Sequence, residues 1–109
     1  MEEISAIDAL SALAHATRLR VFRLLIQKGP SGLIAGDIAR EVQVPPSTLS
    51  THLALLERAG LLRARRVDRR IFYTADYEGM RRLLSFLTED CCQGRPEICG
   101  FLTETVEAC

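Results

Sequence analysis

The stretch GDIAREVQVPPSTLSTHLALLERAG, residues 36–60, decides how this chain folds. Its first part belongs to an apolar pattern that predicts a short helix over residues 34–42. Two prolines follow in a tight connection, and Pro46 suits the first turn of a second helix because an N–H there has no helical partner. We therefore expect two helices joined by a connection of four to five residues. The first of them should face inward with Ile38, Ala39 and Val42.

The second helix of this pair, expected over residues 47–59, has two different faces. Its leucines recur at i, i+4 and i+7 and form an apolar stripe, and Gly60 follows as a favourable residue just beyond the helix end. The other side of the first turns carries short polar side chains, which are poor helix formers but useful hydrogen-bonding groups. The stripe is Leu49, Leu53 and Leu56, and the polar group is Ser47, Thr48, Ser50, Thr51 and the adjacent His52.

Beyond Gly60 the apolar period changes to two, which predicts strands over residues 61–67 and 71–75. Asp68, Arg69 and Arg70 lie between them as a hairpin tip. The predicted fold is therefore mainly α with a two-stranded β-hairpin, a winged helix-turn-helix. A helix of this kind fits the DNA major groove, and cations at a hairpin tip can reach the minor groove or flanking phosphates. We expect the polar group and both arginines to contact double-stranded DNA.

Helices are also predicted on both sides of this unit. A stripe of Ile4, Ile7, Leu10 and Leu13 indicates a first helix, with Ser5 as its N-cap. A second helix is expected from Thr17 to about Gln27, with the apolar face Leu19, Phe22, Leu24, Leu25 and Ile26. A last helix is expected from Asp76 to about Cys92, with Met80, Leu83, Leu84 and Leu87 on its apolar face. Residues 1–92 then form one DNA-binding and dimerisation domain, and residues 93–109 form a tail.

The composition is that of one globular domain: 109 residues, of which 48% are hydrophobic. No run of 18 apolar residues is present, which argues against a membrane partner. The acidic start MEEISAIDALSALA has no basic region of the kind that opens a secretory signal. The prediction is a cytoplasmic location, where thiols stay reduced and cysteines serve metal or redox chemistry more often than disulfides.

The net charge is zero, but the charges are unevenly distributed. Residues 1–15 contain three acidic and no basic residues, residues 16–70 contain eleven basic and four acidic ones, and residues 71–109 contain three basic and seven acidic ones. A basic middle between acidic ends is expected where only the middle meets a polyanion. The charge pattern therefore agrees with DNA contact by the helix pair and the hairpin.

The stretches LAHATRLRVFRLLIQKGP, residues 13–30, and GDIAREVQVPPSTLSTHLALLERAGLLRARRVDRRIFYTA, residues 36–75, resemble the ArsR/SmtB family of bacterial metalloregulatory repressors. The resemblance covers roughly residues 8–90 and is most specific at Ala-Thr-Arg-Leu-Arg and at Ser-Thr-Leu-Ser-Thr-His-Leu. It implies a homodimer whose first and last helices form the interface, and a partly palindromic operator. It also places the polar group of the second helix at the family's DNA-contact positions.

Two sensing sites of that family are missing. Many of its arsenic sensors carry a Cys-Val-Cys motif on the short helix before the recognition helix, where this chain has no cysteine between Leu33 and Ile38. Its zinc sensors use histidines on the last helix, where residues 76–92 contain none. The only histidines are His15 and His52. If the chain senses a ligand, it is expected to do so elsewhere.

All four cysteines lie after residue 90, at Cys91, Cys92, Cys99 and Cys109. In CCQGRPEIC the glycine and the proline let the chain double back, so that the first three thiolates can converge on a soft ion. Adjacent helical positions point about 100° apart, so a fully helical pair would share a ligand poorly, whereas fraying after Leu87 or Thr88 would let both thiols turn inward. The stretch resembles the C-terminal site of some arsenic-responsive members of the family. We expect As(III) or Sb(III) on Cys91, Cys92 and Cys99, and no organic cofactor.

Other chemistries remain open from the sequence. Two reduced thiols could form a disulfide or persulfide sensor, and Cys109 could complete a tetrahedral site for zinc, cadmium or lead. A methylated arsenical would need only two sulfurs, and the ligands could come from one or both subunits. An enzyme is not expected, because a cysteine pair at a helix C-terminus faces the dipole end that disfavours thiolate. The predicted function is a repressor that leaves its operator when the ligand binds.

Overall fold

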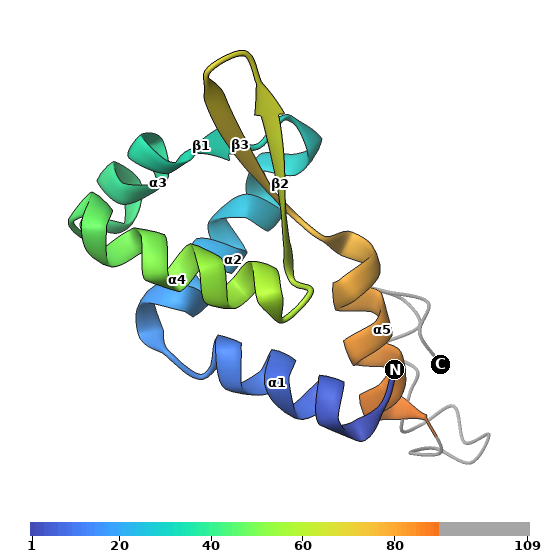
Figure 1. Ribbon diagram of the computed structural model, residues 1–109. Coiled ribbons are helices and arrows are strands. Elements are labelled where there is room, and N and C mark those ends of the chain that lie inside the picture. The colour runs from blue at the N-terminus through green and yellow to red at the C-terminus, as the bar shows by residue number, and fades with distance from the viewer. Residues whose placement is uncertain (90–109) are drawn as a thin grey trace.

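The computed structural model describes residues 1–89, and Cys91, Cys92, Cys99 and Cys109 lie outside the described residues. Figure 1 shows helices α1 to α4 grouped below a projecting β-hairpin, with α5 at one side. The elements are α1 (Glu3–Leu13), α2 (Ala16–Lys28), the short helix η1 (Gly29–Ser31), β1 (Leu33–Ile34), α3 (Ala35–Val42), α4 (Pro46–Arg58), β2 (Leu62–Val67), β3 (Arg70–Ala75) and α5 (Tyr77–Thr88).

The predicted helix pair is confirmed as α3 and α4. Gln43 ends α3 in the left-handed conformation, with φ 59°, and the amide of Val44 donates to the carbonyl of Ala39 at 3.1 Å. Pro45 is extended and Pro46 opens α4, as the sequence predicted. Gly60, with φ +80°, follows the end of α4. These local signals fix the turn between the two helices.

The predicted two-stranded hairpin is confirmed as β2 and β3, and within residues 1–89 a third strand, β1, joins it. β1 pairs antiparallel with β3 through Leu33 opposite Tyr73 and Ile34 opposite Phe72, which gives the order β1-β3-β2. A strand of two residues is too short to show a period, so the sequence did not reveal it. The hairpin tip is also shorter than predicted, because Arg70 belongs to β3 and pairs with Val67.

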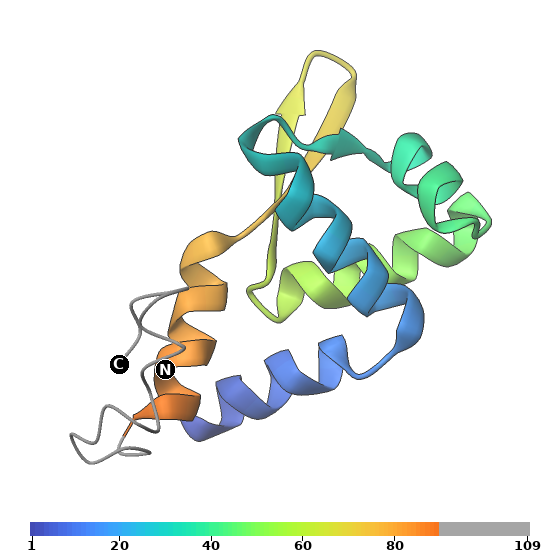
Figure 2. The same cartoon turned by 180° about the vertical axis from the view of Figure 1, so that it is seen from behind.

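The core confirms the leucine stripe of α4. Among the residues that the structure describes, seven large side chains are fully buried, from α2, α3, α4 and the turn that follows α4. α2 lies against α4 on the side seen in Figure 2, which lets the two helices share this core. The seven residues are Val21, Leu25, Ile38, Leu49, Leu53, Leu56 and Leu61.

The first helix does not turn its large apolar side chains toward this core. α1 buries Ala6, Ala9 and Ala12, whereas Ile4, Ile7 and Leu10 are 71%, 54% and 42% exposed. Small side chains allow α1 to lie close to the rest of the domain, which leaves the larger stripe on the outside. The helix begins at Glu3 after an extended Glu2, so the predicted Ser5 cap is wrong. Leu19 of α2 is likewise exposed, and Val21 is buried instead.

The last helix begins as predicted and ends early. Asp76 caps α5 by accepting a hydrogen bond from the amide of Gly79 at 3.0 Å. The helix ends at Thr88, whose hydroxyl donates to the carbonyl of Leu84 at 2.8 Å, and not near Cys92 as predicted. Glu89 leaves the helical conformation with ψ 125°, which ends the hydrogen-bond ladder. Over residues 1–89, no helix is long and apolar enough to cross a membrane.

Candidate nucleic-acid interface

The small polar residues at the start of α4 lie on the surface. Ser47, Thr48, Ser50 and Thr51 are all exposed, and Leu49 between them is buried. The first intrahelical bond of α4 runs from the amide of Leu49 to the carbonyl of Pro45, so the amides of Ser47 and Thr48 have no helical acceptor. Such amides and hydroxyls can meet phosphate oxygens or base edges.

His52 lies on the same helix but turns a different way. Its Nδ1 lies 3.3 Å from Nη1 of Arg18, and its ring centroid lies 4.7 Å from that of His15. Burial lowers the pKa of His52, and repulsion from His15 and then Arg18 lowers it further. The structure therefore joins four of the five predicted α4 contact residues on one exposed surface and directs His52 toward the start of α2.

The hairpin supplies the cationic part of the interface. Arg69 in the turn and Arg70 at the start of β3 are exposed, as are Arg65 and Arg66 on β2. Among residues 1–89, none of these four guanidinium groups lies within 4.0 Å of a carboxylate. Their charge is therefore free to meet phosphates. The hairpin projects beyond the helices, as Figure 1 shows, which suits contact with a second groove or a flanking strand.

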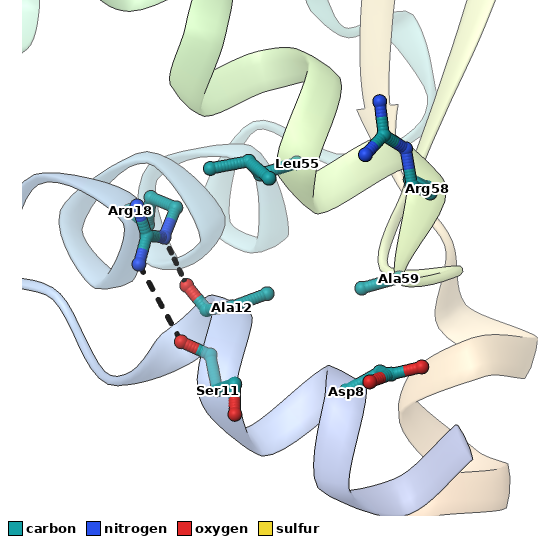
Figure 3. Close-up of a pocket in the computed structure, with 7 residues that line it drawn as sticks. All are labelled: Asp8, Ser11, Ala12, Arg18, Leu55, Arg58 and Ala59. Atoms are coloured by element: carbon teal, nitrogen blue, oxygen red, sulfur yellow. Dashed lines mark hydrogen bonds between the residues drawn. The ribbon is translucent and has the colours of Figure 1, made fainter. Parts of the chain in front are cut away.

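Sequence reasoning missed the two residues that hold His52. His15 is the N-cap of α2, and its Nδ1 accepts a hydrogen bond from the amide of Thr17 at 3.2 Å. Arg18 lies in the first turn of α2, and Figure 3 shows its guanidinium bonded to the carbonyls of Ala12 and Ser11. Histidine is not a common capping residue, and nothing in a linear pattern pairs Arg18 with a residue 34 positions away.

A pocket of about 310 Å³ adjoins Arg18 between α1 and the C-terminal half of α4 (Figure 3). Asp8, Arg18 and Arg58 stand around an apolar wall that includes Leu55. No group of three His, Cys, Asp or Glu side chains able to hold a metal occurs in the part of the chain that the structure describes. The predicted ligands Cys91, Cys92 and Cys99 lie outside that part.

Comparisons with known proteins agree with this geometry. A model of a helix-turn-helix domain matches residues 13–65. The transcriptional activator HlyU of Vibrio cholerae is 30% identical over 81% of this chain and 79% of its own length. A structure of HlyU has a TM-score of 0.65 over 84% of this chain and 99% of that one, at 29% identity. A structure of reduced HlyU from the same organism is 27% identical, with a TM-score of 0.61 over 82% of this chain and 90% of that one.

Two further structures are similar. One, described as a possible transcriptional regulator for arsenical resistance, is 31% identical, with a TM-score of 0.63 over 73% of this chain and 80% of that one. The other is the homodimeric winged helix-turn-helix DNA-binding domain of Mb0332 from Mycobacterium bovis, a possible ArsR-family regulator. It is 27% identical, with a TM-score of 0.65 over 85% of this chain and 83% of that one. The fold, the motif and these relatives agree: this chain belongs to the ArsR/SmtB family of DNA-binding helix-turn-helix transcriptional regulators.

Proposed function

We propose that this protein is a homodimeric repressor that leaves its operator when trivalent arsenic or antimony binds its C-terminal cysteines. The observation that carries the proposal is the separation of two chemistries along the chain. Residues 1–89 contain the helix-turn-helix of a DNA-binding family and, among themselves, no cluster of three metal-ligating side chains, and all four cysteines follow them in the sequence. The family is one of regulators and not of enzymes, in agreement with the sequence prediction.

The exposed start of α4 and the hairpin are the proposed DNA contacts. Ser47, Thr48, Ser50 and Thr51 enter the major groove, and Arg69 and Arg70 meet phosphates or the minor groove beside it. His52 contributes from the edge of the same helix. The free amides at the start of α4 add a favourable site for a phosphate oxygen.

The exposed apolar stripe of α1 supports the proposed dimer. Ile4, Ile7 and Leu10 are exposed on α1, and Leu87 is 47% exposed on α5, which contacts α1. Both helices lie at the end of the domain away from the hairpin, in both views of the molecule. A second copy placed there would remove these side chains from water and leave two copies of α4 free for two half-sites.

The dimer has a direct test in Ile7→Glu. A carboxylate in the centre of the stripe should shift the protein to monomer, whereas Asp8→Ala, one position away on α1, should leave it dimeric. Light scattering after gel filtration measures the mass, and circular dichroism verifies the fold. A monomeric parent, or an Ile7→Glu protein that is still a dimer at the same concentration, would contradict this arrangement.

Cys91, Cys92 and Cys99 are the proposed inducer ligands. Trivalent arsenic prefers three sulfurs in a pyramid, and these three cysteines follow α5, which ends at Thr88. Similarity to a possible regulator for arsenical resistance supports the same inducer. Thiols must lose their protons on binding, so arsenic affinity should rise with pH.

Ligand binding changes the affinity for DNA through α5, which connects the cysteines to the DNA-binding domain. If the ligand moves α5 at the dimer interface, the spacing of the two α4 helices changes. A coupling of ~2–3 kcal/mol weakens DNA binding roughly 30- to 150-fold, and operator DNA must weaken arsenic binding by the same factor.

The experiment is fluorescence anisotropy on the protein's own upstream DNA, with arsenite, antimonite, zinc, cadmium and peroxide added separately. Arsenite should dissociate the complex. Cys91→Ser, Cys92→Ser and Cys99→Ser should bind DNA and ignore arsenite, and Cys109→Ser is the matched control that should respond as the parent does. A complex that persists in arsenite contradicts the proposal, and a Cys109→Ser protein blind to arsenite contradicts the set of three ligands.

Thiol oxidation is the second candidate, and one observation favours it. HlyU, 30% identical to this chain, has a structure described as that of the reduced protein. The same assay separates the two functions: dissociation by peroxide, reversed by dithiothreitol and absent with arsenite, would assign the cysteines to redox sensing.

A further inference from the structure

Arg18 connects three helices through one guanidinium group. Its Nε donates to the carbonyl of Ala12 at 2.6 Å, and its Nη2 donates more weakly to the carbonyl of Ser11 at 3.5 Å (Figure 3). Both carbonyls lie in the last turn of α1, where helical acceptors outnumber the amides; that of Ser11 also accepts from the amide of Ala14 at 3.2 Å. Arg18, at the start of α2, therefore caps the C-terminal end of α1.

The third contact reaches the recognition helix. Nη1 of Arg18 lies 3.3 Å from Nδ1 of His52, which lies in the second turn of α4. Arginine can only donate, so this Nδ1 must be an unprotonated acceptor. A neutral imidazole then carries its proton on Nε2. The contact therefore favours a neutral His52 with its proton on Nε2.

His15 is fixed in the same form by a different bond. Its Nδ1 accepts from the amide of Thr17, so this ring also carries its proton on Nε2 when it is neutral. The two rings lie 4.7 Å apart at 41°, which places two imidazoles and one guanidinium together. A positive charge on His52 is disfavoured by both Arg18 and His15.

We propose that Arg18 is a positioning residue for DNA binding, which holds α4 against the end of α1 through neutral His52. The proposal rests on the DNA interface proposed above, because α4 is the helix that it positions. α1 is also the proposed dimer helix, so the Arg18 contacts set how each α4 stands relative to the dimer axis. Protonation of His52 removes the acceptor and breaks the link.

The two groups that face His52 both disfavour a positive charge on its ring. The groups that face it are His15 and Arg18, from the segment that opens α2. Asp8 of α1 and Arg58 of α4 line the adjoining pocket with Arg18, and in the described part of the chain no carboxylate lies within 4.0 Å of Arg18. The pKa of His52 is lowered by burial first and by these neighbours second, which favours the neutral ring.

The experiment follows DNA affinity from about pH 8 to about pH 5.5, which spans the ordinary imidazole pKa of about 6.5. The full-length parent should lose roughly tenfold in affinity at the acid end, within the usual range of couplings. His52→Asn should show a flat profile whatever its affinity at neutral pH, because its amide oxygen can accept from Arg18 and does not titrate. His15→Asn is the control, because asparagine can still cap α2. This variant should still lose DNA affinity at low pH, which would assign that loss to His52.

Arg18→Gln should lower the neutral-pH affinity roughly tenfold and flatten the profile. Nitrogen-15 NMR of the parent without DNA should show His52 as the Nε2–H tautomer. The proposal would be overturned by any of three results: a different tautomer of His52, a parent whose DNA affinity does not change with pH, or a His52→Asn protein that still loses affinity at low pH. If Arg18→Gln does not fold, the parent tautomer and the His52→Asn profile still decide it. A parent that binds no DNA at neutral pH would overturn the proposed function as well, whereas a wrong tautomer overturns this inference alone.

Discussion

Gly79 lies where the first turn of α5 meets the turn that follows α4, and Gly79→Ala tests how tightly these two segments pack. An added Cβ would lie 3.0 Å from the carbonyl carbon of Gly60 and far closer to its oxygen than van der Waals contact allows. Both atoms of Gly60 belong to the backbone, so the clash cannot be relieved by rotating a side chain. Gly60 is itself constrained by φ +80° and by donating to the carbonyl of Glu57 at 3.0 Å.

Two effects oppose each other in this variant. Replacing glycine by alanine inside a helix stabilises it by about 1 kcal/mol. Forcing an extra methyl group into a packed site costs about 1–3 kcal/mol, and contact with rigid backbone favours the upper end of that range. The clash should win by about 2 kcal/mol, which lowers the Tm by about 8–16 °C for a domain of this size.

The change in Tm is measured by thermal unfolding, monitored by circular dichroism. All proteins are compared at one fixed concentration, because the Tm of a dimer depends on protein concentration. Gly36→Ala is the matched control: it lies in α3 with no atom within 4 Å of the added Cβ, so its Tm should stay level or rise. The reasoning is refuted if Gly79→Ala is as stable as the parent. If both variants lose the same stability, the contact with Gly60 is not the cause.

Three further predictions concern the cap, the hairpin and the effect of pH. Asp76→Ala should lower the free energy of unfolding by about 1 kcal/mol, because the amide of Gly79 loses its cap. Asp76→Asn should retain most of this stability, since the lost ion pair with Arg63 is largely exposed on the arginine side; urea titration compares the two. Arg69→Ala should weaken DNA binding and reduce the salt slope by about one, as anisotropy at several salt concentrations would measure; an unchanged slope argues against a phosphate contact. Because folding lowers the pKa of His52, its contribution to stability is present above the unfolded value of about 6.5 and is lost as pH falls below it. Urea titrations of the parent and of His52→Asn at several pH values would reveal the difference.

The sequence by itself determined the parts of the fold that rest on neighbouring residues. The leucine stripe of α4, Pro46 in its first turn and Gly60 after its end are local signals, and the structure has all of them. The change of period after Gly60 likewise predicted the hairpin. Exposure of Ser47, Thr48, Ser50 and Thr51 follows from the same stripe, because side chains opposite a buried face must meet solvent.

Only the tertiary structure decided features that depend on residues far apart in the chain. β1 exists because Leu33 and Ile34 pair with β3. A stretch of two residues has no pattern from which this pairing could be predicted. Arg18 and His52 meet across 34 positions, and Gly79 is a glycine because of Gly60. The side of α1 that faces the core was decided by close approach. Alanines permit short helix-to-helix distances, so the isoleucines, which look like a core in the sequence, lie outside.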